Sequence, residues 1–141
     1  MPDTTEQLIA GLRIWTKDHD PFVKAAVELL IWRGWLRRGD FVRACVRQEA
    51  GPAAEWSSGT AREAWIDWPQ ARKFADAAST ASTSEMAILD LAIELGRDRF
   101  RFYIMGTAHS KAVAAAVAMA VGEPYDPQAL DREGDPRRSN R

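Results

Sequence analysis

Five arginines within a stretch of fifteen residues are the strongest candidates for chemistry in this sequence. They are Arg33, Arg37, Arg38, Arg43 and Arg47. Two pairs of them are four residues apart, a spacing that puts side chains on one face of a helix. A guanidinium group binds phosphate or carboxylate through two parallel hydrogen bonds, so the cluster predicts an anion-binding or nucleic-acid-binding surface. The other interpretation is a solvated face that is neutralised by acids such as Asp40 and Glu49.

The same stretch also suggests a helix-turn-helix motif. Gly39 separates the two arginine pairs, and the second helix would then enter the major groove. Against this interpretation, Trp35 lies four residues before Gly39, where the motif needs a small side chain for a tight helix crossing. The second helix would offer a groove little beyond Arg43, Arg47 and Gln48. General phosphate contact is therefore the better of the two nucleic-acid interpretations.

Tryptophan is the second unusual feature, with six in 141 residues. Its large amphipathic ring suits both protein cores and the hot spots of interfaces. Three of the six fall in or near a loop-rich middle segment, namely Trp56, Trp65 and Trp68. We expect these three to be exposed anchors for a protein partner. The alternative is that they fold back to cover the core.

The sequence predicts no catalytic or metal centre. His19 and His109, the two histidines, lie far apart in a turn and in the first turn of a helix. Cys45 lies on the apolar face of its predicted helix, where a cysteine is usually an inert small hydrophobe. Asp90 and Glu94 share a helix face but lack the Glu-x-x-His motif of di-metal sites, so a solvated edge is expected. We therefore expect a protein that is not an enzyme and has no metal, cofactor or small-molecule ligand.

The elements that must position these residues are predicted to be helices. Thr4 and Gln7 match a capping box, and the helix that they begin extends to about residue 17. Asp20-Pro21 opens a second helix, which Gly39 would end after about residue 38. Apolar side chains surround almost its whole circumference, which predicts burial on several sides. Further helices are expected over 40–50, 67–78, 82–96 and 108–121.

These elements predict an all-α fold, a single compact domain of five or six helices over residues 1–122. Its centre would be the buried helix at about 21–38. Residues 123–141 contain three prolines and nine charges, which predicts a flexible, disordered tail. The sequence does not decide whether the segment 97–106 forms a strand or a helix. Its Arg-Phe-Arg-Phe alternation suggests a strand, but no partner strand is evident nearby.

Composition limits the classes of function. The chain is 46% hydrophobic and 28% charged with a net charge of −1, so no global field attracts nucleic acid or membranes. One cysteine cannot form an internal disulfide, which favours a reducing compartment. The first residues, Met-Pro-Asp-Thr-Thr-Glu, contain no basic or apolar leader, and no apolar stretch is long enough for a membrane span. A cytoplasmic protein without membrane contacts is expected.

One segment carries a resemblance. Ser82 to Gly122 contains Ser-Thr-Ser-Glu-Met-Ala-Ile-Leu-Asp-Leu-Ala and, later, Ala-Val-Ala-Met-Ala-Val-Gly. It is similar to a pattern in helical proteins of high-GC actinobacteria and their mobile elements. The resemblance covers less than a third of the chain. It implies an all-helical fold in a bacterial or phage cytoplasm, and it carries no activity and no functional residue.

These features together predict an interaction or regulatory module that binds a protein partner, with a second copy of itself among the candidates. The alternative prediction is a helical nucleic-acid-binding protein, or a small subunit of a nucleoprotein complex, that uses the arginine surface.

Overall fold

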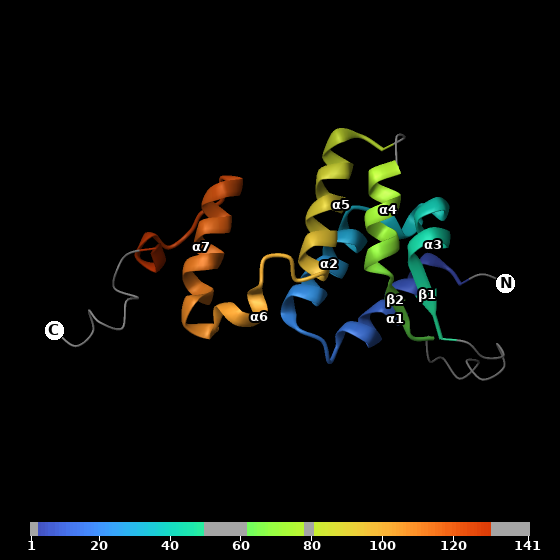
Figure 1. The fold of residues 1–141 in the computed structure, drawn as a ribbon, viewed down its shortest axis with the longest axis horizontal. Helices are drawn as coiled ribbons and strands as arrows, with labels where there is room; N and C mark the ends of the chain where they lie inside the picture. The colour runs from blue at the N-terminus through green and yellow to red at the C-terminus, as the bar shows by residue number, and fades with distance from the viewer. Residues whose placement is uncertain (1–2, 50–61, 78–80, 131–141) are drawn as a thin grey trace. The chain divides into compact units, whose positions relative to one another are not determined.

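The computed structural model describes residues 3–49, 62–77 and 81–130, which contain seven α-helices and one pair of short strands (Figure 1). The predicted mostly helical fold is confirmed. The chain divides into two compact units after Phe100, and each unit is described by itself. That residues 1–122 form one domain stays a prediction. Among the described helices, none combines the length and the apolar character needed to cross a membrane.

The first two helices begin where the capping patterns indicated. α1 covers Thr5–Thr16, and both hydrogen bonds of the capping box between Thr4 and Gln7 are present. α2 covers Pro21–Trp32, with Asp20 at the N-cap and a proline at the first helical position. The two helices pack against each other. A side-chain capping box thus begins α1, whereas α2 begins with Pro21 at its first position and without a capping bond from the Asp20 side chain.

The second helix ends earlier than predicted. A helix to about residue 38 was expected, but α2 stops at Trp32 and Gly34 turns the chain with a φ of +83°. A 3₁₀ helix, η1 (Trp35–Arg37), follows. The turn brings Trp35 and Leu36 into the core, where they are 1% and 2% exposed. The turn at Gly34 therefore places the two residues that follow it in the core of the first unit.

The third helix is also shorter than predicted, and two strands replace part of it. α3 covers Gly39–Cys45, whereas a helix over 40–50 was expected. The chain then extends as β1 (Val46–Gln48), which pairs antiparallel with β2 (Ala64–Ile66). Strands of three residues are too short to show alternation in the sequence, and the partner strand lies sixteen residues further on.

β2 packs against α1 and so holds the small sheet on this helix. Ala64 and Ile66 are buried, and Trp65 between them is 36% exposed, as expected when successive side chains point to opposite faces. Gly11 of α1 lies so close to this segment that a Cβ atom there would collide with the carbonyl oxygen of Arg62. Only glycine permits this approach.

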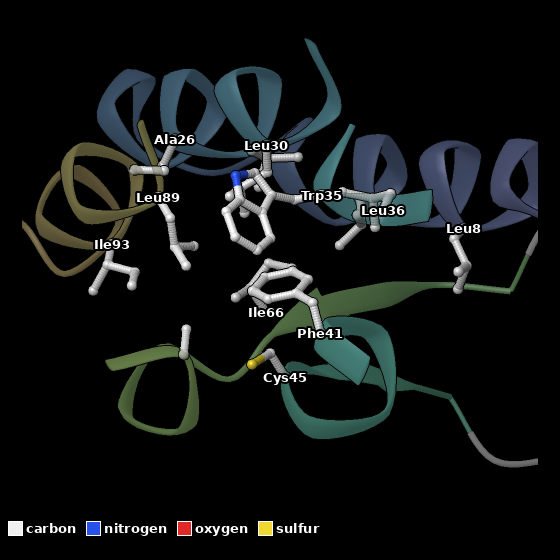
Figure 2. Close-up of a cluster of buried hydrophobic side chains, with 14 of the residues drawn as sticks. Leu8, Ala26, Leu30, Trp35, Leu36, Phe41, Cys45, Ile66, Leu89 and Ile93 are labelled. Atoms are coloured by element: carbon white, nitrogen blue, oxygen red, sulfur yellow. The ribbon is translucent and has the colours of Figure 1, made fainter. Parts of the chain in front are cut away.

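Two further helices, α4 (Trp68–Ala77) and α5 (Thr83–Gly96), complete the first unit. α2 packs along α5, and α3 packs along α4. Figure 2 shows Trp35 and Phe41 in the middle of the core, between α2 and α3. The Phe74 ring meets both edge-on, with centroid distances of 6.3 Å to Trp35 and 5.5 Å to Phe41. The largest fully buried side chains are Trp35, Phe41, Leu12, Leu30, Leu89, Ile93, Val27 and Cys45.

The second unit is built around one helix. Its described elements are α6 (Phe102–Met105), η3 (Thr107–His109), α7 (Ser110–Val121) and η4 (Pro127–Leu130) (Figure 1). The segment 97–106, left open by the sequence, therefore contains a short helix and no strand. α7 begins two residues later than expected and ends at Gly122 as expected. Of the predicted tail, residues 123–130 are described, and 131–141 lie outside the described residues.

Candidate functional site

The five arginines of the predicted anion surface lie in five different local settings. Arg33 follows α2, Arg37 ends η1, Arg38 precedes α3, Arg43 lies in the last turn of α3, and Arg47 lies in β1. The four-residue spacings therefore do not produce two helical pairs. The early end of both helices is the physical reason, because it breaks the periodicity on which those pairs depend.

A carboxylate from α5 joins two of these arginines. Glu85 lies 3.6 Å from Arg33 and 3.5 Å from Arg38, measured between guanidinium nitrogen and carboxylate oxygen. Arg38 also contacts Asp40 at 3.5 Å, and its guanidinium carbon lies 4.9 Å from the centre of the Trp35 ring. This cluster joins the end of α2 to the start of α5, so its first role is to hold the fold.

Ser82 and Glu85 have the spacing of a capping box at the start of α5, and only half of that box forms. The Ser82 hydroxyl oxygen accepts a hydrogen bond from the Glu85 amide at 3.2 Å. The Glu85 carboxylate contacts the Ser82 hydroxyl and the two arginines rather than the Ser82 amide. Charge attraction from Arg33 and Arg38 competes with the backbone donor for this carboxylate.

The other three arginines differ in their partners. Arg47 pairs with Asp67 at 3.5 Å. Arg37 and Arg43 are exposed and form no ion pair with any described residue. The guanidinium of Arg43 folds back over α3, since a Cβ placed on Gly39 would lie 3.0 Å from it. Two of the five arginines thus keep uncompensated charge within the described part of the chain.

The three tryptophans expected at a partner interface have separate outcomes. Trp56 lies outside the described residues. Trp68 is half-buried, and its ring packs directly on Gly96, where any Cβ would collide with it. Trp65 is 36% exposed on the outer face of β2, opposite Arg47 in the strand register. Of the two described, Trp65 therefore remains available to a partner, and Trp68 packs between helices.

A fourth tryptophan, which the sequence did not single out, is the most exposed in the described chain. Trp32 is 74% exposed at the last residue of α2. The neighbouring Arg33 is half-exposed, and Arg37 follows at the end of η1, where it is exposed. Trp32, Arg33 and Arg37 are called the Trp32 corner below. Since α2 is apolar around nearly its whole circumference, sequence periodicity could not show which of its apolar residues is exposed.

Among the residues that the structure describes, the other titratable groups form no reactive cluster. Cys45 has no exposed surface, and burial raises the pKa of its thiol to about 12. The Nδ1 atom of His19 lies within hydrogen-bond distance of the Trp15 carbonyl oxygen, at 2.7 Å. Asp90 and Glu94, expected at a solvated edge, bind Arg72 of α4 at 2.6 and 3.1 Å. The described residues contain no group of three or more ligands that could hold a metal ion.

Comparison of the chain with family models, curated proteins and solved structures finds no significant match. The resemblance of Ser82 to Gly122 therefore gains no support from them. Any functional conclusion rests on the residues and contacts described above.

Proposed function

We propose that this protein is a non-enzymatic module that binds a protein partner through the Trp32 corner. One observation carries the proposal, namely a tryptophan that is 74% exposed on a well-formed helix. A side chain of this size is usually withdrawn from water, because burying an aromatic ring is strongly favourable. An exposed tryptophan at a fixed position is therefore a candidate anchor for a partner.

The composition of the corner supports this proposal. Tryptophan and arginine are the residues most enriched in interface hot spots. Trp32 is held by α2 on one side and by the Gly34 turn on the other, so little backbone freedom is lost when a partner binds. Arg37 adds a positive charge that no described carboxylate neutralises. The matching partner surface is an apolar pocket with an acidic rim.

The test is co-purification of the tagged full chain from its native host, with wild type and Trp32→Ala compared side by side. The substitution should weaken capture of a specific partner by about thirtyfold, the effect of losing roughly 2 kcal/mol at a hot spot. Leu91→Ala is the matched control, because Leu91 is an exposed apolar residue of α5 at 42% exposure. Trp32→Ala should change the unfolding temperature little, since it removes few native contacts.

Equal capture by wild type and Trp32→Ala would reject the Trp32 corner as the binding surface. Equal loss with Leu91→Ala would indicate a general surface effect and would also reject it.

Nucleic-acid binding is the second candidate, and Arg37 and Arg43 are the observation that favours it. Each phosphate contact adds about 0.9 to the slope of log affinity against log salt, so two arginines predict a slope near 2. A mobility shift with single- and double-stranded DNA and RNA measures this slope. The double variant Arg37→Ala with Arg43→Ala should abolish the mobility shift. Absence of binding at low salt would reject this second candidate.

A further inference from the structure

α7 lacks the cover that a helix of its length needs. Among the side chains described in residues 101–130, Ala115 is the only buried one, at 6% exposure. α7 has twelve residues, and an isolated helix of that length is marginal in water because nucleation is costly. Packing of an apolar face supplies most helical stability in proteins. Some surface must therefore cover α7.

The structure shows which side of α7 is already occupied. Lys111, Ala114, Ala115 and Ala118 line a groove between α7 and the segment 124–129, which includes η4. Val113, Val117 and Val121 follow one another at four-residue spacing along the rest of the helix, and we call them the valine row. Val117 is 55% exposed and Val121 is 68% exposed. Within the second unit, the valine row is the surface that remains to be covered.

Charge around the valine row points to one kind of occupant. No charged residue lies between 112 and 122. Lys111 lies at the N-terminal end of α7, and Glu123 follows its C-terminal end. Two copies of this helix placed antiparallel bring each lysine to the end that carries the glutamate, and they also oppose their helix dipoles. A parallel pair would bring like charges together.

We propose that α7 is a self-association surface, and that the valine rows of two copies pack against each other with the helices antiparallel. A two-fold axis at Val117 places Val113 of one copy opposite Val121 of the other, and it brings the helix end that carries Lys111 beside the end of the other copy that Glu123 follows. Such an interface is isologous, so one apolar surface satisfies both copies. This inference concerns the second unit and is independent of the Trp32 corner in the first.

Sedimentation equilibrium of the full chain tests the proposal. The wild type should associate reversibly to a dimer. Val117→Glu should raise the dissociation constant by about a hundredfold or more, because two carboxylates would meet at the axis. Met119→Glu is the matched control. It adds the same charge to the same helix at a residue that is 50% exposed, about 160° around the helix from Val117.

A cross-linking experiment tests the antiparallel arrangement without a destabilising charge. Chains carrying Val113→Cys and chains carrying Val121→Cys are mixed and treated with a short bis-maleimide. The mixture should yield covalent dimers, and each variant alone should yield few, because like positions lie about 12 Å apart along antiparallel helices. Cys45 is buried and does not compete.

A wild type that stays monomeric at all concentrations overturns the proposal. Equal dissociation constants for Val117→Glu and Met119→Glu also overturn it. Efficient cross-linking of each cysteine variant with itself would reject the antiparallel arrangement in favour of a parallel one.

Discussion

Cys45 lies within the core of the first unit, close to Phe41 and Ile66 (Figure 2). Burial raises the pKa of its thiol to about 12, compared with 9.0 for a free thiol, and the nearby Arg47 charge only partly offsets this effect. The thiolate is the reactive form of cysteine, so the native protein should react with thiol reagents only when the core opens. The reaction rate then measures the opening of the core.

The same shift predicts how stability depends on pH. Between about pH 9 and pH 12 the thiol of the unfolded chain is ionised while that of the folded chain is still protonated. The unfolded state therefore gains stability over this range, and the free energy of unfolding falls as the pH rises. Denaturant titrations of wild type and Cys45→Ala measure the effect. The wild type should lose more stability across this window, and identical slopes would contradict the prediction.

Arg72 binds three carboxylates from two helices. Its guanidinium contacts Asp76 at 3.0 Å, Asp90 at 2.6 Å and Glu94 at 3.1 Å. Hydrogen bonding to Asp90, against the effect of burial, raises the pKa of the Arg72 guanidinium above its ordinary value. The arrangement balances repulsion among acids that would otherwise separate α4 from α5.

Arg72→Met should lower the free energy of unfolding by about 1–3 kcal/mol near neutral pH, because it leaves three carboxylates without their shared cation. Arg97→Met removes the same charge from an exposed position after α5 and should change stability little. Equal losses in the two variants, measured by urea unfolding, would contradict this role.

At the scale of elements, two glycines hold neighbouring helices in place for different reasons. Gly34 has a φ of +83° in open space, so an added methyl group strains only the backbone. Gly11 has ordinary helical geometry, but a Cβ there would collide with the Arg62 carbonyl oxygen and force α1 away from β2.

Gly34→Ala should therefore cost about 1 kcal/mol, and Gly11→Ala should cost more, about 2–3 kcal/mol. Chemical denaturation of both variants checks the order. A larger loss for Gly34→Ala would show that the turn after α2 matters more than the contact between α1 and β2.

The starts of the first two helices could be predicted from the sequence because they depend on residues close to them in the chain. Thr4 and Gln7 bond to backbone groups within one turn, and Pro21 fixes the backbone at the first helical position, so these residues show where α1 and α2 begin. The ends of α2 and α3 depend on tertiary packing, because the chain reverses at Gly34 to bury Trp35. Either Gly34 or Gly39 could end a helix locally, and only the burial of Trp35 and Leu36 shows that the chain turns at Gly34.

The candidate site was predictable only as a region of the chain. The sequence located the arginines between residues 33 and 47, but their partners Glu85 and Asp67 lie 52 and 20 residues away. No periodic pattern reveals such long-range ion pairs. Trp32 was missed because apolar residues surround almost all of α2, so no polar face shows which of its residues are exposed.

At the scale of the whole molecule, the two proposed surfaces lie in separate units. The Trp32 corner belongs to the unit that ends at Phe100, and the valine row belongs to the unit that follows. A dimer formed through α7 would carry two Trp32 corners. Two linked binding sites raise the apparent affinity for a partner that presents repeated sites, provided that both can be reached at once.

The division after Phe100 also separates the natural chromophores of the chain. All six tryptophans precede residue 100, and both tyrosines, Tyr103 and Tyr125, follow it. Indole emission therefore reports on the first unit, and the phenol bands report on the second once second-derivative absorbance separates them from the overlapping indole bands. One unlabelled sample can yield a separate unfolding curve for each unit. Coincident curves would identify a single cooperative transition across Phe100, and separate curves would identify two independently melting units.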